Sequence, residues 1–365
     1  MTYELRQSTW EEFCKNTNDN YLEWGAPLTP EQYLQREIDT KEVVHGHRGW
    51  ILTLDGQAVA SCETYSNTSF YIRKSDKKLT EGISESVASV FVEPQFRGKG
   101  YATKMMILLN QKFQSEKRIF CDLYSDVDPK VYEKCGWHQF PAKSFYINET
   151  DYERLLQLKP SSTGLLRTTE TITHQNYEPL LEHEKQKTIQ MFNNIVQKED
   201  TDSSIQYYFG KIFSKENFLW NTTNGKVYAR YLNLPTPVNF GMLLKCNEGS
   251  MKSYVLWNHD LKDLQLNILK FFCKSQEEFL ILIQSCIEEA KKFNMPQVTI
   301  WYDSHTTSYH FDPLWLEPLG LKITTRVKSS IPMVSSWVPL DPNSDQIVDT
   351  TKSGQWINIE KFNWV

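Results

Sequence analysis

The chain has 365 residues, which at roughly 150 residues per domain favours two domains. With 40% hydrophobic and 13% aromatic residues it can build packed cores, and its 15 glycines and 15 prolines show no periodicity, which excludes collagen-like and low-complexity chains. Forty basic against 45 acidic side chains leave a net charge of −5, which argues against nucleic-acid binding as the main function.

The cysteine pattern and the chain ends bear on location. Seven cysteines is an odd number and none forms a Cys-x-x-Cys pair, so we expect no disulfide framework, no zinc ribbon and no bound metal. A reducing, cytoplasmic compartment fits this cysteine usage best. The first residues contain no apolar core of signal-peptide length, and no apolar run reaches roughly 18 residues, so we expect no membrane-spanning segment.

The first half alternates strand and helix patterns, which is typical of an α/β unit. Strands are predicted at residues 3–7, 50–54, 57–65, 85–92, 119–124 and 145–148, the last of which is expected to close the unit. Helices are predicted at residues 9–16, 29–40, 101–116 and 129–135.

A Lys-Pro-Ser-Ser-Thr-Gly stretch at residues 159–164 has the composition of a linker, so the predicted domains are residues 1–158 and 165–365. In the second half, helices are predicted at residues 177–197, 204–219 and 276–293. Strands are predicted at residues 226–231, 239–246, 252–257, 264–272 and 298–302. Residues 316–321 echo residues 132–137, which favours a degenerate internal duplication. The alternative is two unrelated α/β domains with a similar element order.

The segment from Val90 to Lys104 carries the clearest chemical signal. A β-branched strand ends near Val92, a loop with Gly98 and Gly100 follows, and an amphipathic helix begins near Tyr101. Glycines allow close backbone approach to an anion, and the N–H groups at a helix N-terminus point toward it. The pattern therefore predicts a pyrophosphate cradle; the alternative is a glycine-rich turn with surface charges.

Gln95-x-x-Gly98-x-Gly100 resembles the acyl-CoA loop of the GNAT acetyltransferases, and it is neither a Walker loop nor a dinucleotide fingerprint. The resemblance implies a GNAT fold, with a mixed central sheet flanked by helices, followed by a second, degenerate GNAT-like domain. It also implies acetyl-CoA as cosubstrate. The residues expected to bind it are Phe91, Val92, Gln95, Arg97, Gly98, Lys99, Gly100, Tyr101, Ala102, Thr103 and Ser125.

The segment after the next strand extends this resemblance. Tyr132, in Val131-Tyr-Glu-Lys-Cys-Gly-Trp137, falls on the tyrosine that in GNAT enzymes protonates the departing CoA thiolate. Ser125 and Asp128 replace the Asn and Ala usual in the family, which leaves the contact of Ser125 with the pantetheine arm in question. The alternative for Tyr132 is a packing role on a short helix.

Amine acetylation needs a proton acceptor, because only roughly one alkyl amine in a few thousand is neutral at pH 7. Glu85 lies near the position where several GNAT enzymes place a catalytic glutamate, and Glu63 is expected on the neighbouring strand. Each could instead be a solvated or capping carboxylate. The carboxylate of Val365 is a third candidate, by analogy with two-part GNAT proteins whose C-terminus returns to the active site.

The second half lacks the features of the first. Cys273-Lys274-Ser275 connects a predicted strand to a predicted helix without a glycine pair or an arginine, and Leu316 stands where the echo would place Tyr132. We therefore expect this half to be catalytically empty and to shape the substrate pocket or pack as a structural partner.

The whole chain also resembles the fungal lysine N6-acetyltransferases of lysine catabolism. The resemblance rests on residues 33–37, Ser61-Cys-Glu63, residues 88–91, residues 97–106 and the aromatic ending at 356–365. It implies acetylation of the side-chain amine of free L-lysine in the cytoplasm. The candidate partners of the substrate's charges are Glu23, Glu37, Glu63, Asp122 and Arg36, and Trp24 and Tyr33 could wall its stem.

Two other functions remain open from the sequence. One is a GNAT enzyme acting on another amine, such as a polyamine, a protein lysine or a protein N-terminus. The other is a CoA-binding protein that has lost acetyl transfer.

Overall fold

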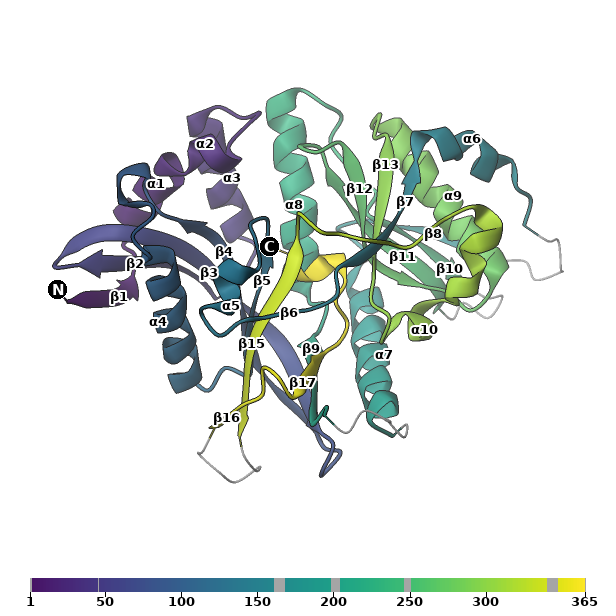
Figure 1. Ribbon diagram of the computed structural model, residues 1–365. Coiled ribbons are helices and arrows are strands. Elements are labelled where there is room, and N and C mark those ends of the chain that lie inside the picture. Colours follow the sequence, from purple (N-terminus) through teal and green to yellow (C-terminus); the bar gives the residue numbers. More distant parts are fainter. Residues whose placement is uncertain are drawn as a thin grey trace.

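The computed structural model describes residues 2–44, 46–160, 168–197, 204–245, 251–339 and 347–364. The chain forms two mixed β-sheets that stand side by side, with helices packed on both (Figure 1). The helices are α1 (Trp10–Asp19), α2 (Tyr21–Trp24), α3 (Pro30–Lys41), α4 (Tyr101–Ser115), α5 (Lys130–Glu133), α6 (Glu149–Gln157), α7 (Glu178–Gln197), α8 (Lys215–Leu232), α9 (Gln276–Lys292) and α10 (Thr307–His310).

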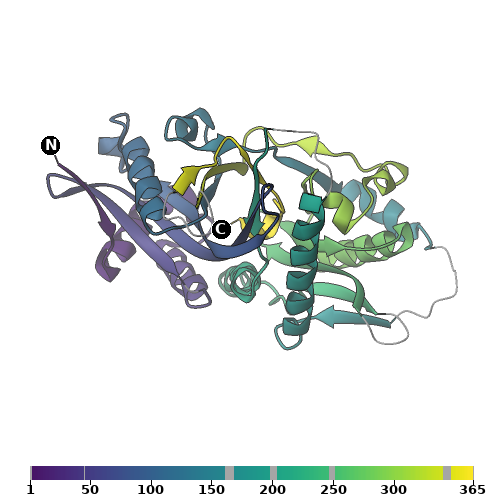
Figure 2. The same ribbon diagram turned by 90° about the horizontal axis from the view of Figure 1, so that it is seen from below.

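The first sheet is built mainly from the first half of the chain. Its order is β1 (Tyr3–Gln7), β2 (His47–Leu54), β3 (Gln57–Arg73), β4 (Leu79–Phe91), β5 (Phe120–Ser125), β15 (Ile331–Pro339) and β16 (Ile347–Asp349). Three strands join off this path: β6 (His138–Gln139), β9 (Tyr207–Lys211) and β17 (Gly354–Trp356). Seen from below, the sheet curls, and the long strand β3 meets β9, which in turn pairs with β17 (Figure 2).

The second sheet has the order β14 (Thr324–Thr325), β7 (Lys143–Asn148), β13 (Gln297–Tyr302), β12 (Gln265–Phe272), β11 (Met251–Asp260), β10 (Gly241–Lys245) and β8 (Thr168–Ile172). β12 and β13 run parallel, and helix α9 connects them. Phe279, Ile283 and Ile287 of α9 are fully buried against this sheet, which is the apolar stripe expected of an amphipathic helix.

The two halves exchange strands. β7 pairs with β13 of the second sheet, whereas β15, from near the end of the chain, pairs with β5 of the first sheet. The prediction that residues 145–148 close the first unit was therefore wrong. Phe145 of β7 lies in the core of the second sheet, and Trp337 of β15 packs in the core of the first. Sequence proximity favoured the wrong sheet because neighbouring strands usually pair with each other.

Two further predictions in the second half were wrong. Residues 204–219 were expected to be helical, but the aromatic run Tyr207–Lys211 forms strand β9, and the helix begins only after Ser214 caps it through the Asn217 N–H. Residues 226–231 were expected to be a strand, yet they continue α8. Val227 and Ala229 are buried there by tertiary packing, which overrides the β-propensity of this segment.

The central strands of the first sheet part from each other. β4 and β5 run parallel and are paired at Glu85–Cys121 and Ser86–Asp122, but no further register is formed although both strands continue. On its other side, β4 carries a bulge opposite Ser61–Glu63, where Ser89 has a φ of 53°. The divergence opens space between the strands directly before the glycine loop.

We predict that residues 1–160 alone will not form a stable domain. The fragment lacks β9, β15 and β17, so the β5 edge and the side chain of Phe120, which packs on Phe209 and Trp356, would be exposed. Circular dichroism and thermal unfolding of the purified fragment should show no cooperative transition, whereas the full chain should show one. A cooperative transition in the isolated fragment would contradict the structural importance of the exchanged strands.

Candidate active site

A cavity of about 520 Å³ lies where β4 and β5 part, and both halves of the chain line it. The first half contributes residues of α2, α3, β4 and β5. The second half contributes residues of α8, the β11–β12 turn and Trp364 near the C-terminus. The second half therefore shapes the pocket of the first, as expected from its sequence.

The glycine loop stands at the N-terminus of α4. Gly98 and Gly100 have φ values of 76° and 80°, a left-handed backbone that favours glycine. Gly100 is the N-cap residue of α4, and its position carries no side-chain cap. A Cβ added at either glycine would meet no atom within 4 Å, so the space before the loop is open. Uncapped N–H groups and the helix dipole facing open space suit an anion such as a pyrophosphate.

The other residues expected to bind the cosubstrate surround this loop. The Nε of Arg97 donates to the Val92 carbonyl at 2.9 Å, and its Nη2 pairs with Glu23 at 2.7 Å. Lys99 is exposed above the ring of Phe96, and Gln95 donates to Glu93. Phe91 is buried at the end of β4, and the first turn of α4 holds half-buried Tyr101, Ala102 and Thr103.

Tyr132 and Ser125 line the cavity near the end of β5. Tyr132 lies on the short helix α5, and burial, with the nearby thiols and Asp126 adding to it, raises the pKa of its phenol to about 12. It therefore keeps its proton at neutral pH. The Ser125 hydroxyl is engaged within its own turn, donating to the Val127 carbonyl at 2.7 Å.

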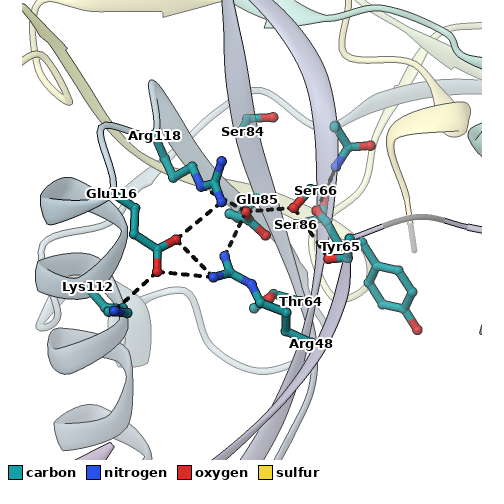
Figure 3. A network of polar contacts seen from close by, with 12 residues as sticks. Arg48, Thr64, Tyr65, Ser66, Ser84, Glu85, Ser86, Lys112, Glu116 and Arg118 are labelled. Atoms are coloured by element: carbon teal, nitrogen blue, oxygen red, sulfur yellow. Dashed lines mark hydrogen bonds and ion pairs between the residues drawn. The ribbon is translucent and has the colours of Figure 1, made fainter. Parts of the chain in front are cut away.

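Glu85 does not line the cavity. Strand alternation turns it toward α4, where it is fully buried and its Oε1 accepts from Arg48 and Ser66, each at 2.8 Å (Figure 3). Arg118 approaches the same oxygen at 3.1 Å, and Glu116 bridges the two arginines. Burial raises the pKa of Glu85, although the arginines oppose this shift. The arrangement makes Glu85 the centre of a structural ion-pair network.

Glu63 is also held by polar partners outside the large cavity. Its Oε2 lies 3.0 Å from Lys41 Nζ and 2.9 Å from His47 Nε2, and Tyr65 donates to it at 3.3 Å. Burial opposes ionisation, but Lys41 and His47 together hold the pKa of Glu63 well below its usual range. An ionised carboxylate with three donors is a weak proton acceptor.

The candidate substrate residues of the first half come together on the cavity wall. Trp24, Tyr33 and Arg36 all line it. The guanidinium of Arg36 lies 5.0 Å from the ring centre of Tyr33 and 5.9 Å from that of Tyr228, and it pairs with Glu37. Its buried Nε has no hydrogen-bond partner within the described chain. Val365 lies outside the described residues.

A buried ion pair lies at the wall of the cavity where the strands part. Lys211 of β9 pairs with Asp122 of β5 at 2.8 Å, and both side chains are fully buried. The same ammonium donates to Ser86 of β4 and, at 3.2 Å, to the Asn363 carbonyl. The sequence marked Asp122 as a possible substrate contact, but Lys211 was missed because nothing in its local pattern indicates a buried charge.

In the second sheet, the turn before α9 corresponds to the glycine loop before α4. A side chain of α9 itself occupies this turn. Ser275 caps α9, and the buried Glu278 carboxylate accepts from the Lys274 N–H at 3.0 Å and from Ser253 at 2.5 Å. A carboxylate thus occupies the helix N-terminus at which an anionic ligand would bind. We expected no phosphate cradle in this half, and the Glu278 carboxylate would repel an anion at this turn.

The described residues also bear on metal and membrane binding. No cluster of three or more His, Cys, Asp or Glu side chains in this part of the chain could hold a metal ion. No helix found among the same residues is both long and apolar enough to cross a bilayer.

We predict that Arg48→Met will lower the free energy of unfolding by roughly 3 kcal/mol, because it removes one partner of a fully buried carboxylate. Lys112→Met is the matched control, since Lys112 pairs with Glu116 at the exposed end of the same network, and it should cost less than about 1 kcal/mol. Urea unfolding of the variants measures both effects. Equal losses of unfolding free energy in the two variants would argue against a special role for the buried Arg48–Glu85 pair.

Comparisons with known proteins agree with this geometry. The model described as the LYC1 GNAT-like C-terminal domain matches residues 155–365, and that of the Acetyltransferase (GNAT) family matches residues 3–137. A lysine acetyltransferase of Yarrowia lipolytica is 24% identical over 332 residues, covering 76% of this chain and 78% of that protein. An uncharacterized protein of Saccharomyces cerevisiae, YGR111W, is 23% identical over 338 residues, covering 84% of this chain and 77% of that protein.

Solved structures share the fold over nearly the whole chain. A probable N-acyltransferase of Enterococcus faecalis superposes with a TM-score of 0.59 at 12% identity, covering 92% of this chain and 72% of that one. A tandem GNAT protein from the clavulanic acid biosynthesis pathway gives 0.53 at 10% identity, covering 93% and 100%. The resemblance first indicated by the glycine loop is confirmed: the chain belongs to the GNAT family of acetyltransferases.

Proposed function

We propose that the protein transfers the acetyl group of acetyl-CoA to the side-chain amine of free L-lysine, a reaction that would commit lysine to catabolism. The observation that carries the proposal is the charge of the cavity wall. Two cationic side chains, Arg36 and Lys262, line it against six carboxylates: Glu23, Glu37, Asp122, Asp126, Asp260 and Asp263. Three of these carboxylates are paired with cations, Glu23 with Arg97, Glu37 with Arg36 and Asp122 with Lys211. The negative charge that attracts a cationic amine therefore lies with Asp126, Asp260 and Asp263.

Arg36 favours an amino acid over a simple polyamine. Its guanidinium lies on the cavity wall with a buried Nε that lacks a protein partner, and a planar guanidinium suits a carboxylate. The rings of Tyr33 and Tyr228 beside it offer apolar surface for an aliphatic stem. These groups together suit a zwitterion with a long side chain.

Contacts between the halves favour a small substrate over a protein. Lys262 Nζ of the β11–β12 turn donates to the Trp24 carbonyl at 3.0 Å, and Arg230 of α8 pairs with Asp39 of α3 at 3.1 Å. The second half is thereby joined to the rim of the first around the cavity. A folded protein or an extended peptide would require a more open groove.

The residues present fit acetyl-CoA and the transfer step. Bound acetyl-CoA would supply an activated acetyl thioester. The N–H groups of residues 98–101 would hold its pyrophosphate, and the space between β4 and β5 would take its pantetheine arm. Tyr132, whose pKa of about 12 keeps its phenol protonated, would donate a proton to the departing sulfur. The amine proton would pass to a carboxylate of the cavity wall, because Glu85 and Glu63 are bound by cations outside it.

The first test is an amine panel with acetyl-CoA and thiol detection. We expect CoA release with free L-lysine to exceed that with spermidine, cadaverine and lysine-containing peptides. The mass of the product should identify acetylation at the side-chain amine. Equal rates on peptides and free lysine would refute the substrate assignment, and a preference for cadaverine would favour a polyamine enzyme.

The second test addresses the proton donor. Tyr132→Phe should lower kcat by about a hundredfold or more with little change in acetyl-CoA affinity, because only the donor is removed. Glu85→Gln should lower thermal stability and leave kcat within about threefold, since Glu85 interacts only with the structural network away from the cavity. Steady-state kinetics measures kcat, calorimetric titration measures the affinity for acetyl-CoA, and thermal unfolding measures the stability of the Glu85→Gln variant. Normal turnover by Tyr132→Phe would show that the phenol is not the acid.

A further inference from the structure

The second half contributes an unusual group of hydrogen-bond acceptors to the cavity. Asn258 and Asp260 lie two residues apart on β11 and so share one face of the sheet, and Asn267 of β12 stands directly opposite Asn258. All three residues line the cavity. The Oδ1 atoms of Asn258 and Asn267 are buried and have no hydrogen-bond partner anywhere in the described ranges.

The orientation of the Asn258 amide follows from a chain of hydrogen bonds. Asn221 Nδ2 donates to the Asn217 backbone carbonyl at 2.9 Å, which can only accept, so Asn221 presents its Oδ1 to Asn258. Asn258 Nδ2 donates to that oxygen at 3.1 Å. The remaining atom of the Asn258 amide is therefore the acceptor Oδ1.

The Asn267 amide is fixed in the same way. Its Nδ2 donates to the Asp260 carboxylate at 3.3 Å, and an ionised carboxylate can only accept. Asn267 Oδ1 is thus left as a second free acceptor. Three neutral groups donate to the Asp260 carboxylate: this amide, the Gln265 side chain and the Asp263 N–H. In the described part of the chain no cation lies within ion-pair distance of Asp260, although the Lys361 ammonium is near enough to interact with its charge.

Two amide oxygens and one carboxylate match the needs of a primary ammonium, which has three N–H donors and no acceptor. Buried acceptors left unpaired cost free energy, so a donor bound here would recover it. A carboxylate ligand is disfavoured, since the unpartnered atom of each amide is an oxygen and Asp260 would repel it. The cluster therefore selects for a cation.

The position of the cluster relative to Arg36 indicates which ammonium group of the substrate would bind there. The guanidinium lies 5.9 Å from the ring centre of Tyr228, and one turn earlier on α8 a Cβ at Gly225 would stand 2.7 Å from the carbonyl oxygen of His259, between Asn258 and Asp260, so the guanidinium and the acceptor cluster both lie close to this ring. A carboxylate partner and an ammonium partner close to one ring match the head group of an α-amino acid.

We infer that Asn258, Asn267 and Asp260 form a subsite for the α-ammonium of the substrate, so that the head group is held between these residues of the second half and Arg36 of the first, while the side-chain amine extends toward β4 and β5. The inference rests on the proposed lysine acetylation and deepens it. It makes the second half a determinant of specificity for free α-amino acids, without a catalytic residue of its own.

The test compares L-lysine with 6-aminohexanoate, which has the same reacting amine and carboxylate but no α-ammonium. The variants are Asn258→Ala, Asn267→Ala and Asp260→Asn. Asn193→Ala, on the exposed surface of α7, is the matched control. Each test variant should lower kcat/KM for L-lysine by about tenfold and leave that for 6-aminohexanoate nearly unchanged, because a lost charge-assisted hydrogen bond corresponds to about one factor of ten.

The ratio of kcat/KM for L-lysine to that for 6-aminohexanoate separates recognition from folding, since a misfolded fraction lowers both values equally. Equal losses on both substrates, with Asn193→Ala unaffected, would overturn the α-ammonium subsite while leaving lysine acetylation intact. The unmodified protein could instead bind acetyl-CoA in calorimetry yet acetylate neither compound. That result would overturn the proposed function and the subsite together.

Discussion

The buried ion pair between Lys211 and Asp122 holds the parts of the active site together. Lys211 belongs to the second half of the chain, Asp122 to β5, and the same ammonium also donates to Ser86 of β4 and to the carbonyl of Asn363. It therefore joins both central strands and the C-terminal segment at the last point where β4 and β5 are paired. A fully buried charge left without its partner would cost roughly 3–5 kcal/mol, which makes this junction hard to separate.

Strand exchange has the same effect on a larger scale. Because β15 completes the first sheet and β7 completes the second, neither sheet is whole without a segment from the other half of the chain. The two halves are thereby fixed side by side, and the turn after β11 reaches the rim of the first half at Trp24. A cavity built from both halves can then keep a constant shape around a small substrate.

The two halves have taken different roles although they share a fold. In the first, two glycines with left-handed backbone leave the N-terminus of α4 open. In the second, the carboxylate of Glu278 fills the same position on α9. The N-terminus of α4 is thus open, whereas a carboxylate occupies that of α9. We propose that the second half has kept a different task, recognition of the substrate head group through Asn258, Asn267 and Asp260.

The family, the glycine loop and most elements of the first half could be predicted from the sequence alone, because they depend on local patterns: backbone freedom at Gly98 and Gly100, and apolar periodicity along α4. It did not determine the partners of Glu85. The local pattern placed this glutamate before the loop, but only the packed sheet turned it toward Arg48 and Arg118. Nor could it assign β7 and β15 to their sheets or bring Lys211 to Asp122. These pairings join residues far apart in the chain, and their free energy depends on burial that exists only once both halves are folded.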